Sequence, residues 1–128
     1  MPVEDRCNAI EECYEFMLAY AAQGLAGDEG SQSGGQLRHY LARAAEALNG
    51  LAAAYAGELN GHHAFLAVLD RDAGDSLAAV EMVVAQPALS SQLIDNLNAS
   101  IHLRALLTDL LLIDEVLKLQ RTPAKVEP

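Results

Sequence analysis

The chain has 128 residues, of which 52% are hydrophobic and only 5% aromatic, and it contains no Trp. This length corresponds to one domain that can bury a core. A formal net charge of −10, with eight Lys plus Arg, leaves no cationic surface for nucleic acid or for an anionic membrane, so neither is expected as a partner.

The first predicted helix runs from about Val3 to Gln23 and ends at Gly24, a residue typical of helix C-termini. Phe16 and Tyr20 widen its apolar face beyond one stripe, which indicates a second contact. Its expected inward stripe contains Ile10, Cys13, Tyr14, Met17 and Ala21.

The two cysteines lie on this predicted helix. Cys7 and Cys13 would be about 9 Å apart along its axis and on different faces, so they cannot pair with each other. The segment before them is acidic and does not have the pattern of a secretory signal. A reducing cytoplasm is therefore the expected location. Acidic neighbours disfavour a thiolate, and nucleophilic catalysis is not expected.

Residues 25–35 are rich in Gly, Ser and Gln and predict a flexible loop. A second helix is predicted from about Gln36 to Ala56, and Gly50 inside it suggests a close approach of two helices. A third helix begins near His62 and ends before Pro87, because proline cannot continue a helix.

Ser91 to Arg121 predicts one long C-terminal helix, capped by Ser90 or Ser91. From Leu103 to Leu119 this helix is apolar on nearly every side, although charged residues that include Arg104, Asp109, Asp114 and Glu115 exclude a membrane span. A helix of this kind must be covered on more than one side, and a second copy of the chain is the preferred cover. The candidate interface residues are Leu103, Leu106, Leu107, Leu110, Leu111, Ile113 and Leu117, with Phe16 and Tyr20 from the first helix.

These elements predict an all-α fold, specifically an antiparallel four-helix bundle with a long C-terminal helix. Residues 1–121 would form this single helical-bundle domain. Residues 122–128 would form a disordered tail.

Polar residues at helical spacing form a candidate ligand strip on the long helix. Bundles build ligand and metal sites from such side chains on facing helices, and Glu11 or Glu15 could assist. The alternative is a solvated strip or a buried polar layer. The chain has no Glu-x-x-His pair, and we expect no bound metal and no cofactor. The strip consists of Asp95, Asn98, His102 and Asp109.

Other candidate sites are weaker. Residues 70–81 carry acids at calcium-loop positions, but Asp75 occupies the position at which that loop needs glycine. His62 and His63 are adjacent and would point in different directions on a helix. His39 is expected on an outer face.

The sequence thus favours a small acidic cytoplasmic interaction module, an adaptor, regulator or accessory subunit that acts as a homodimer and not as an enzyme. Its expected partners are a second copy of itself or another protein. One alternative is a ligand- or metal-binding bundle that uses Asp95, Asn98 and His102. Another is a chaperone that binds a client helix in a groove formed by Leu103–Leu119.

Overall fold

The computed structural model describes residues 1–121, and within this range it is all-helical, without strands. The prediction of a disordered tail at 122–128 lies outside the described residues. Between residues 1 and 121, no helix has the length and hydropathy needed to cross a bilayer. The helices are α1 (Val3–Ala21), α2 (Gln32–Leu48), α3 (Leu51–Tyr55), α4 (His63–Val84), α5 (Ser91–Asn98) and α6 (Ile101–Arg121).

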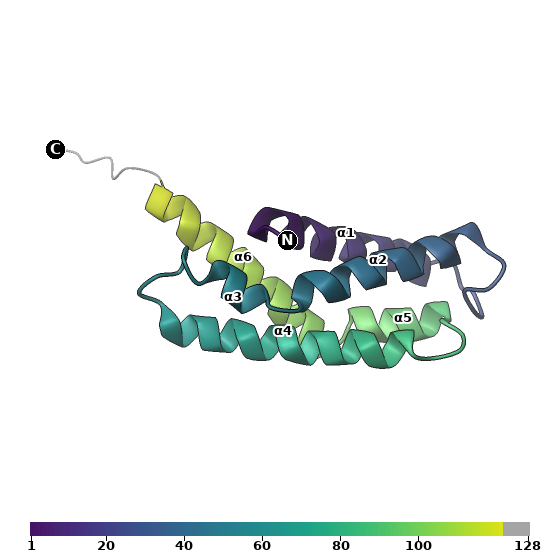
Figure 1. The fold of residues 1–128 in the computed structure, drawn as a ribbon. Coiled ribbons are helices and arrows are strands. Elements are labelled where there is room, and N and C mark those ends of the chain that lie inside the picture. The colour runs from purple at the N-terminus through teal and green to yellow at the C-terminus, as the bar shows by residue number, and fades with distance from the viewer. Residues whose placement is uncertain (122–128) are drawn as a thin grey trace.

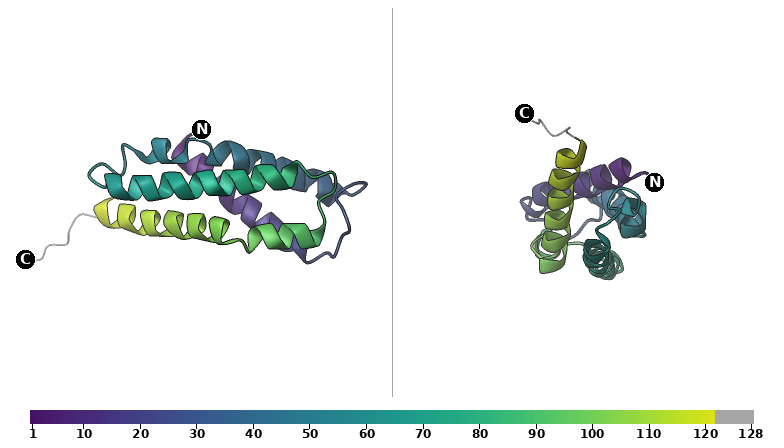
Figure 2. Two further views of the ribbon diagram at one scale, coloured as in Figure 1. Left: turned by 90° about the horizontal axis from the view of Figure 1, so that it is seen from below. Right: turned by 90° about the vertical axis from the view of Figure 1, so that its left-hand side faces the viewer.

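Most of the helices run roughly along one long direction of the molecule (Figures 1 and 2). α1 packs along α2 and against α5, whereas α4 packs against α2, α3 and α6. α1 and α6 share few close backbone contacts, and the end-on view in Figure 2 shows that they run in different directions. Their divergence leaves part of the α6 surface without a neighbouring helix.

The predicted single helix over Ser91–Arg121 is wrong, because the chain breaks it at Ala99 and Ser100. The Ser100 hydroxyl accepts a hydrogen bond from Leu103 N at 3.3 Å and so starts α6 as a cap. Serine competes with helix propagation in this way. The break lets α5 pack on α1 while α6 packs on α4.

The predicted helix over Gln36–Ala56 is also divided. Gly50 has φ of +79°, a left-handed conformation that glycine adopts without strain, and it separates α2 from α3. A Cβ at Gly50 would meet no atom within 4 Å. Gly50 therefore serves as a turn and not, as predicted, as a point of close helix approach.

The predicted loop over residues 25–35 is shorter than expected, because α2 begins at Gln32. Ser31 caps it by accepting a hydrogen bond from Gly34 N at 2.9 Å. Within the remaining loop, Asp28 is buried and accepts hydrogen bonds from Arg38 and from Leu89 N. The segment is therefore anchored to α2 and to the α4–α5 connection.

Tyr20 fixes the same end of the molecule. Its hydroxyl donates to Leu89 O at 2.7 Å, and its carbonyl accepts from the Ser91 hydroxyl at 2.7 Å. Leu25 N in turn donates to Ser91 Oγ at 2.8 Å. Together these bonds join the α1–α2 loop to the start of α5.

Candidate functional site

Most side chains of the predicted dimer interface lie in the core of their own chain. The five innermost leucine and isoleucine side chains of α6 are at most 8% exposed, and Tyr20 is fully buried. Because these side chains offer almost no exposed surface to a second copy, the predicted interface is corrected at these positions. The covered α6 residues are Leu103, Leu106, Leu110, Ile113 and Leu117.

The other predicted interface residues are more accessible. Phe16 is half-buried and stacks on Tyr40, with ring centroids 4.8 Å apart. Leu107 is half-buried, and Leu111 is 69% exposed. Leu111 is thus the one member of the predicted α6 set with a largely free side chain.

A different set of α6 residues carries the exposed apolar surface. Ile101 is 75% exposed, Leu112 52% and Leu119 74%. Their spacing places them on one line along the outer face, with Thr108 between the first two. We call Ile101, Thr108, Leu112 and Leu119 the outer stripe. The predicted interface left these residues out, because in a segment that is apolar on nearly every side the sequence does not show which side stays exposed.

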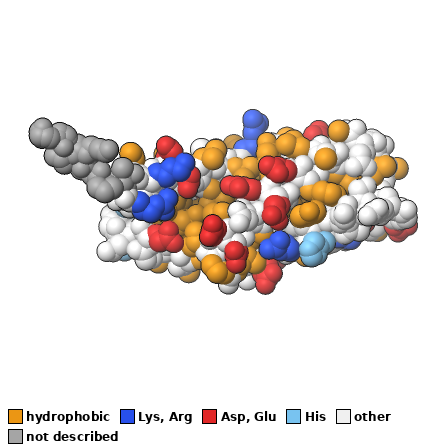
Figure 3. All heavy atoms as spheres, turned by 90° about the horizontal axis from the view of Figure 1, so that it is seen from above, with side chains coloured by type: hydrophobic (Ala, Val, Ile, Leu, Met, Phe, Trp, Pro, Cys, Tyr) orange, Lys and Arg blue, Asp and Glu red, His pale blue; other side chains and the backbone are white. Residues whose placement is uncertain are grey.

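A second feature is a groove of about 440 Å³ where α1 and α6 diverge. We call it the α1–α6 groove. Its lining comes from the first half of α1, from α3 and the turn after it, and from the second half of α6. Figure 3 views this face of the molecule and shows apolar surface bordered by acidic side chains.

The floor of the groove is apolar or weakly polar. Leu110 and Leu117 line it from α6, and Cys7 meets Tyr55 with 3.0 Å between thiol sulfur and hydroxyl oxygen. Burial raises the pKa of Cys7, and nearby carboxylates raise it further, while the Tyr55 hydrogen bond opposes them. The thiol therefore stays protonated at neutral pH and is a poor nucleophile.

Four carboxylates stand around this floor, and all four are exposed. Lys118 lies 3.4 Å from Asp114 and 3.9 Å from Glu115, so Asp114 is partly neutralised. Glu4, Glu11 and Glu58 have no ion pair with any residue of the described range 1–121. Arg121 contributes one cation at the end of the groove. The rim therefore keeps an excess of negative charge.

The structure brings only part of the candidate ligand strip together, because Asp95 and Asn98 line one hollow beside Tyr14 of α1 whereas His102 and Asp109 do not line it. Asp95 and His102 are exposed, whereas Asn98 and Asp109 are 6% and 7% exposed. The helix break after Asn98 removes the common face on which that prediction depended. Within residues 1–121, no group of three or more His, Cys, Asp or Glu side chains could hold a metal ion.

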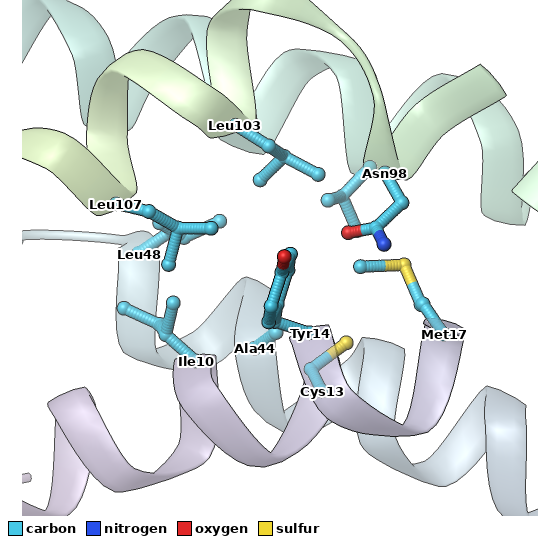
Figure 4. Close-up of a pocket in the computed structure, with 10 residues that line it drawn as sticks. Ile10, Cys13, Tyr14, Met17, Ala44, Leu48, Asn98, Leu103 and Leu107 are labelled. Atoms are coloured by element: carbon cyan, nitrogen blue, oxygen red, sulfur yellow. The ribbon is translucent and has the colours of Figure 1, made fainter. Parts of the chain in front are cut away.

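Asn98 instead points into a small cavity between α1, α2, α4 and α6 (Figure 4). The cavity has about 20 Å³, which is room for about one water molecule. Its other lining residues are mainly apolar, including Cys13, Met17 and Leu103. The Asn98 Oδ1 atom has no hydrogen-bond partner in the described chain. The cavity is too small for a metabolite.

Asp109 lies near Asp72, which belongs to the candidate calcium loop at residues 70–81 in the sequence analysis. Burial is the main cause that raises the pKa of Asp109 to about 7, and the carboxyl group of Asp72 on α4 adds to it. Asp109 Oδ2 is buried without a hydrogen-bond partner within residues 1–121. Asp72 follows buried Leu69 by three residues and precedes buried Ser76 by four. That spacing beside the inward stripe was the available signal for its position.

The remaining predicted sites have plain structural roles. Residues 70–81 lie inside the unbroken helix α4, so they form no calcium loop. His62 precedes the first residue of α4, and its Nε2 lies 3.4 Å from Gln120 Nε2. His39 is exposed and contacts the Tyr40 ring. Cys13 is a core residue whose burial raises its pKa to about 12.

No protein-family model, no curated protein and no solved structure matches this chain. The functional argument therefore depends on the two exposed features of α6, the outer stripe and the α1–α6 groove.

Proposed function

We propose that this protein is a small acidic interaction module, an adaptor, regulator or accessory subunit, that acts as a homodimer through the outer stripe of α6. The observation that carries the proposal is the alignment of three large, exposed apolar side chains on one helix face. Scattered exposed leucines are common on protein surfaces, whereas an aligned apolar surface is typical of an interaction site.

The stripe is also symmetric along the helix. Ile101 and Leu119 are equally far in sequence from Leu110, and so are Thr108 and Leu112. A two-fold dimer brings one surface patch against itself, so that residue i meets residue j and j meets i. An antiparallel pair of α6 helices would therefore place Ile101 beside Leu119 of the second copy over about 27 Å of helix.

Charged residues beside the stripe suit the same arrangement. Arg104 and Glu115 are exposed and lie almost equally far from Leu110 on its two sides. In the antiparallel pair, each arginine would approach a glutamate of the second copy. The net charge of −10 on each chain opposes association, so added salt should strengthen the dimer.

Within this proposal the domain is an antiparallel four-helix bundle, in which α2 with α3 and α5 with α6 each count as one interrupted helix. Both cysteines are free, which supports a reducing cytoplasm as the location. The ligand-binding alternative loses support, because Asp95 and His102 are exposed while Asn98 and Asp109 are buried.

Sedimentation velocity over a range of protein concentrations tests the dimer. We expect wild type to dimerise and Leu112→Arg to remain monomeric with an unchanged helical circular dichroism spectrum. Met82→Arg is the matched control, because Met82 is 65% exposed and belongs to α4 and not to the stripe. A monomeric wild type, or a Leu112→Arg variant that dimerises like wild type, would refute the proposed interface.

A charge exchange tests the antiparallel geometry. Arg104→Glu and Glu115→Arg should each weaken the dimer by placing like charges together, and the double variant should recover much of the loss. Additive losses in the double variant would show that these residues do not meet across the interface.

A further inference from the structure

The α1–α6 groove is separate from the outer stripe. Leu111 borders the groove, while the three large apolar stripe residues lie on another side of α6 and are absent from the groove lining. A molecule in the groove would therefore not compete directly with the dimer proposed above. Whatever occupies the groove can be argued from its own residues.

Three elements bring carboxylates to one point of this groove. Glu11 comes from α1, Glu58 from the turn after α3, and Asp114 from α6. All three act electrostatically on the same Cys7 thiol and raise its pKa, which agrees with their placement around the floor. The convergence is a property of the fold, because these residues are far apart in sequence.

The floor between these carboxylates would bury apolar side chains. Leu110 and Leu117 are already almost covered, whereas Leu111 is largely exposed and offers additional apolar area. A volume of about 440 Å³ admits side chains of a bound segment. An amphipathic segment can place its apolar side on such a floor and its charged residues on the rim.

The charge of the rim selects the kind of segment. Glu4, Glu11 and Glu58 lack a cationic partner within residues 1–121, so added Lys or Arg would meet unpaired carboxylates. A second copy of this chain is a poor occupant, because it carries a net charge of −10. The C-terminal residues 122–128 contain one Lys and one Glu and would not neutralise the rim.

We propose that the α1–α6 groove binds a short cationic amphipathic segment of a partner protein. An apolar side chain of the segment rests against Leu111 and Leu117, and its Lys or Arg residues face Glu11 and Glu58. The complex is favoured by apolar burial together with charge attraction, so it weakens as salt rises.

Fluorescence anisotropy with a defined probe tests this proposal. The probe is a fluorescein-labelled peptide of ~15 residues, about the length from which an isolated peptide forms helix in water. Its helix carries leucines on one face and lysines on the other. Two further peptides carry glutamate in place of lysine or the same residues in scrambled order. We expect saturable binding of the first peptide alone, weaker at about 300 mM than at about 50 mM NaCl.

Matched charge variants locate the binding site. Glu11→Gln with Glu58→Gln should weaken binding by about tenfold, because two attractive contacts are removed. Glu46→Gln with Glu81→Gln changes the net charge equally on exposed parts of α2 and α4, and should change affinity less than about twofold. Bound peptide should also slow alkylation of Cys7 at the groove floor.

Several outcomes would overturn the proposal. The first two are the absence of saturable binding and equal binding of the scrambled peptide. The third is an equal loss of peptide affinity in both double variants, which would indicate attraction by net charge only. Unchanged Cys7 alkylation in the saturated complex would place the peptide elsewhere. The same titration with Leu112→Arg separates this proposal from the dimer, because groove binding should persist in that variant.

Discussion

The Arg38 Nε atom lies 2.6 Å from Asp28 Oδ2, and this pair joins the α1–α2 loop to helix α2. The other carboxylate oxygen of Asp28 accepts a hydrogen bond from Leu89 N at 2.7 Å. Arg38 also donates to Val84 O at 3.2 Å. One ion pair therefore holds together the loop, α2 and the α4–α5 connection.

Asp28→Asn should destabilise the protein by about 1–3 kcal/mol at neutral pH, because it removes one partner of a largely buried charged pair. The Arg38 hydrogen bond, assisted by that of Leu89, lowers the pKa of Asp28 in the folded state. Its contribution is therefore complete above the ordinary value of 3.8 and is lost as pH falls through the folded pKa.

Urea unfolding at neutral and acidic pH measures this effect. The difference in the free energy of unfolding between wild type and Asp28→Asn should become smaller at acidic pH. Asp75→Asn, at an exposed position on α4, should cost little at either pH. Equal losses at both positions would mean that the buried pair adds no stability.

Gly34 and Gly35 provide a matched pair at the start of α2. A Cβ at Gly34 would clash with the backbone oxygen of Asp28, whereas a Cβ at Gly35 would meet no atom within 4 Å. Gly34→Ala should cost about 1–3 kcal/mol, because the backbone of the loop must move. Gly35→Ala should stabilise α2 by up to about 1 kcal/mol, because alanine favours helix.

Thermal and denaturant unfolding of the two single variants compare them directly. We expect the Gly→Ala substitution to lower the free energy of unfolding at position 34 and to raise it at position 35. If Gly34→Ala were as stable as Gly35→Ala, the close approach of Asp28 to α2 would not exist in solution.

Two helices could be located from the sequence almost to the residue. α1 was predicted from Val3 to about Gln23 and spans Val3–Ala21, and α4 was predicted from near His62 to before Pro87 and spans His63–Val84. Each ends close to a residue that stops helices, Gly24 or Pro87. In both helices the apolar periodicity ends where the helix-stopping residue lies, so the two patterns predict the same boundary.

The breaks inside the other two predicted helices were missed for a common reason. Gly50 and Ser100 both lie within continuous helical periodicity, and a single glycine or serine inside such a pattern is often tolerated. Tertiary packing decides where both helices end. The turn at Gly50 lets α3 pack against α4, and the turn before Ile101 lets α6 pack against α4.

The surface features of α6 could not be predicted from its own residues. A segment that is apolar on all sides does not reveal which sides its neighbours cover. The groove also requires Cys7 from α1 and Glu58 from the turn after α3, whose positions depend on how α1 diverges from α6. Asp28 was similarly hidden, because its partner Leu89 is 61 residues away in sequence.

Asp109→Asn should stabilise the protein in mild base. The pKa of Asp109 is raised from an ordinary value of 3.8 to about 7, so the folded state holds a proton that the unfolded state releases. The favourable contribution of this group is present below pH ~4 and is lost as pH rises through about 7. Asp109→Asn removes this pH dependence, and its free energy of unfolding should exceed that of wild type by roughly 1–3 kcal/mol above pH ~8.

Unfolding measured across this pH range tests the carboxyl pair. Asp72→Asn should give a smaller gain in the free energy of unfolding, because it removes the repulsion between the two carboxylates but leaves Asp109 buried. Asp70→Asn, an exposed neighbour on the same helix, should retain the wild-type pH dependence. A wild-type pH profile in Asp109→Asn would show that the Asp109 carboxyl does not carry this pH dependence.

Asn98→Leu should increase stability by about 1 kcal/mol, because the Oδ1 atom is buried without a hydrogen-bond partner in the described chain. Leucine has a similarly branched side chain, and the cavity next to Asn98 is lined mainly by apolar groups. Asn96→Leu, at an exposed position on the same helix, should change stability by less than about 0.5 kcal/mol. The urea midpoint at unchanged slope measures both effects. A destabilised Asn98→Leu would instead show that the amide hydrogen-bonds to a water molecule in the cavity, which has the volume for one.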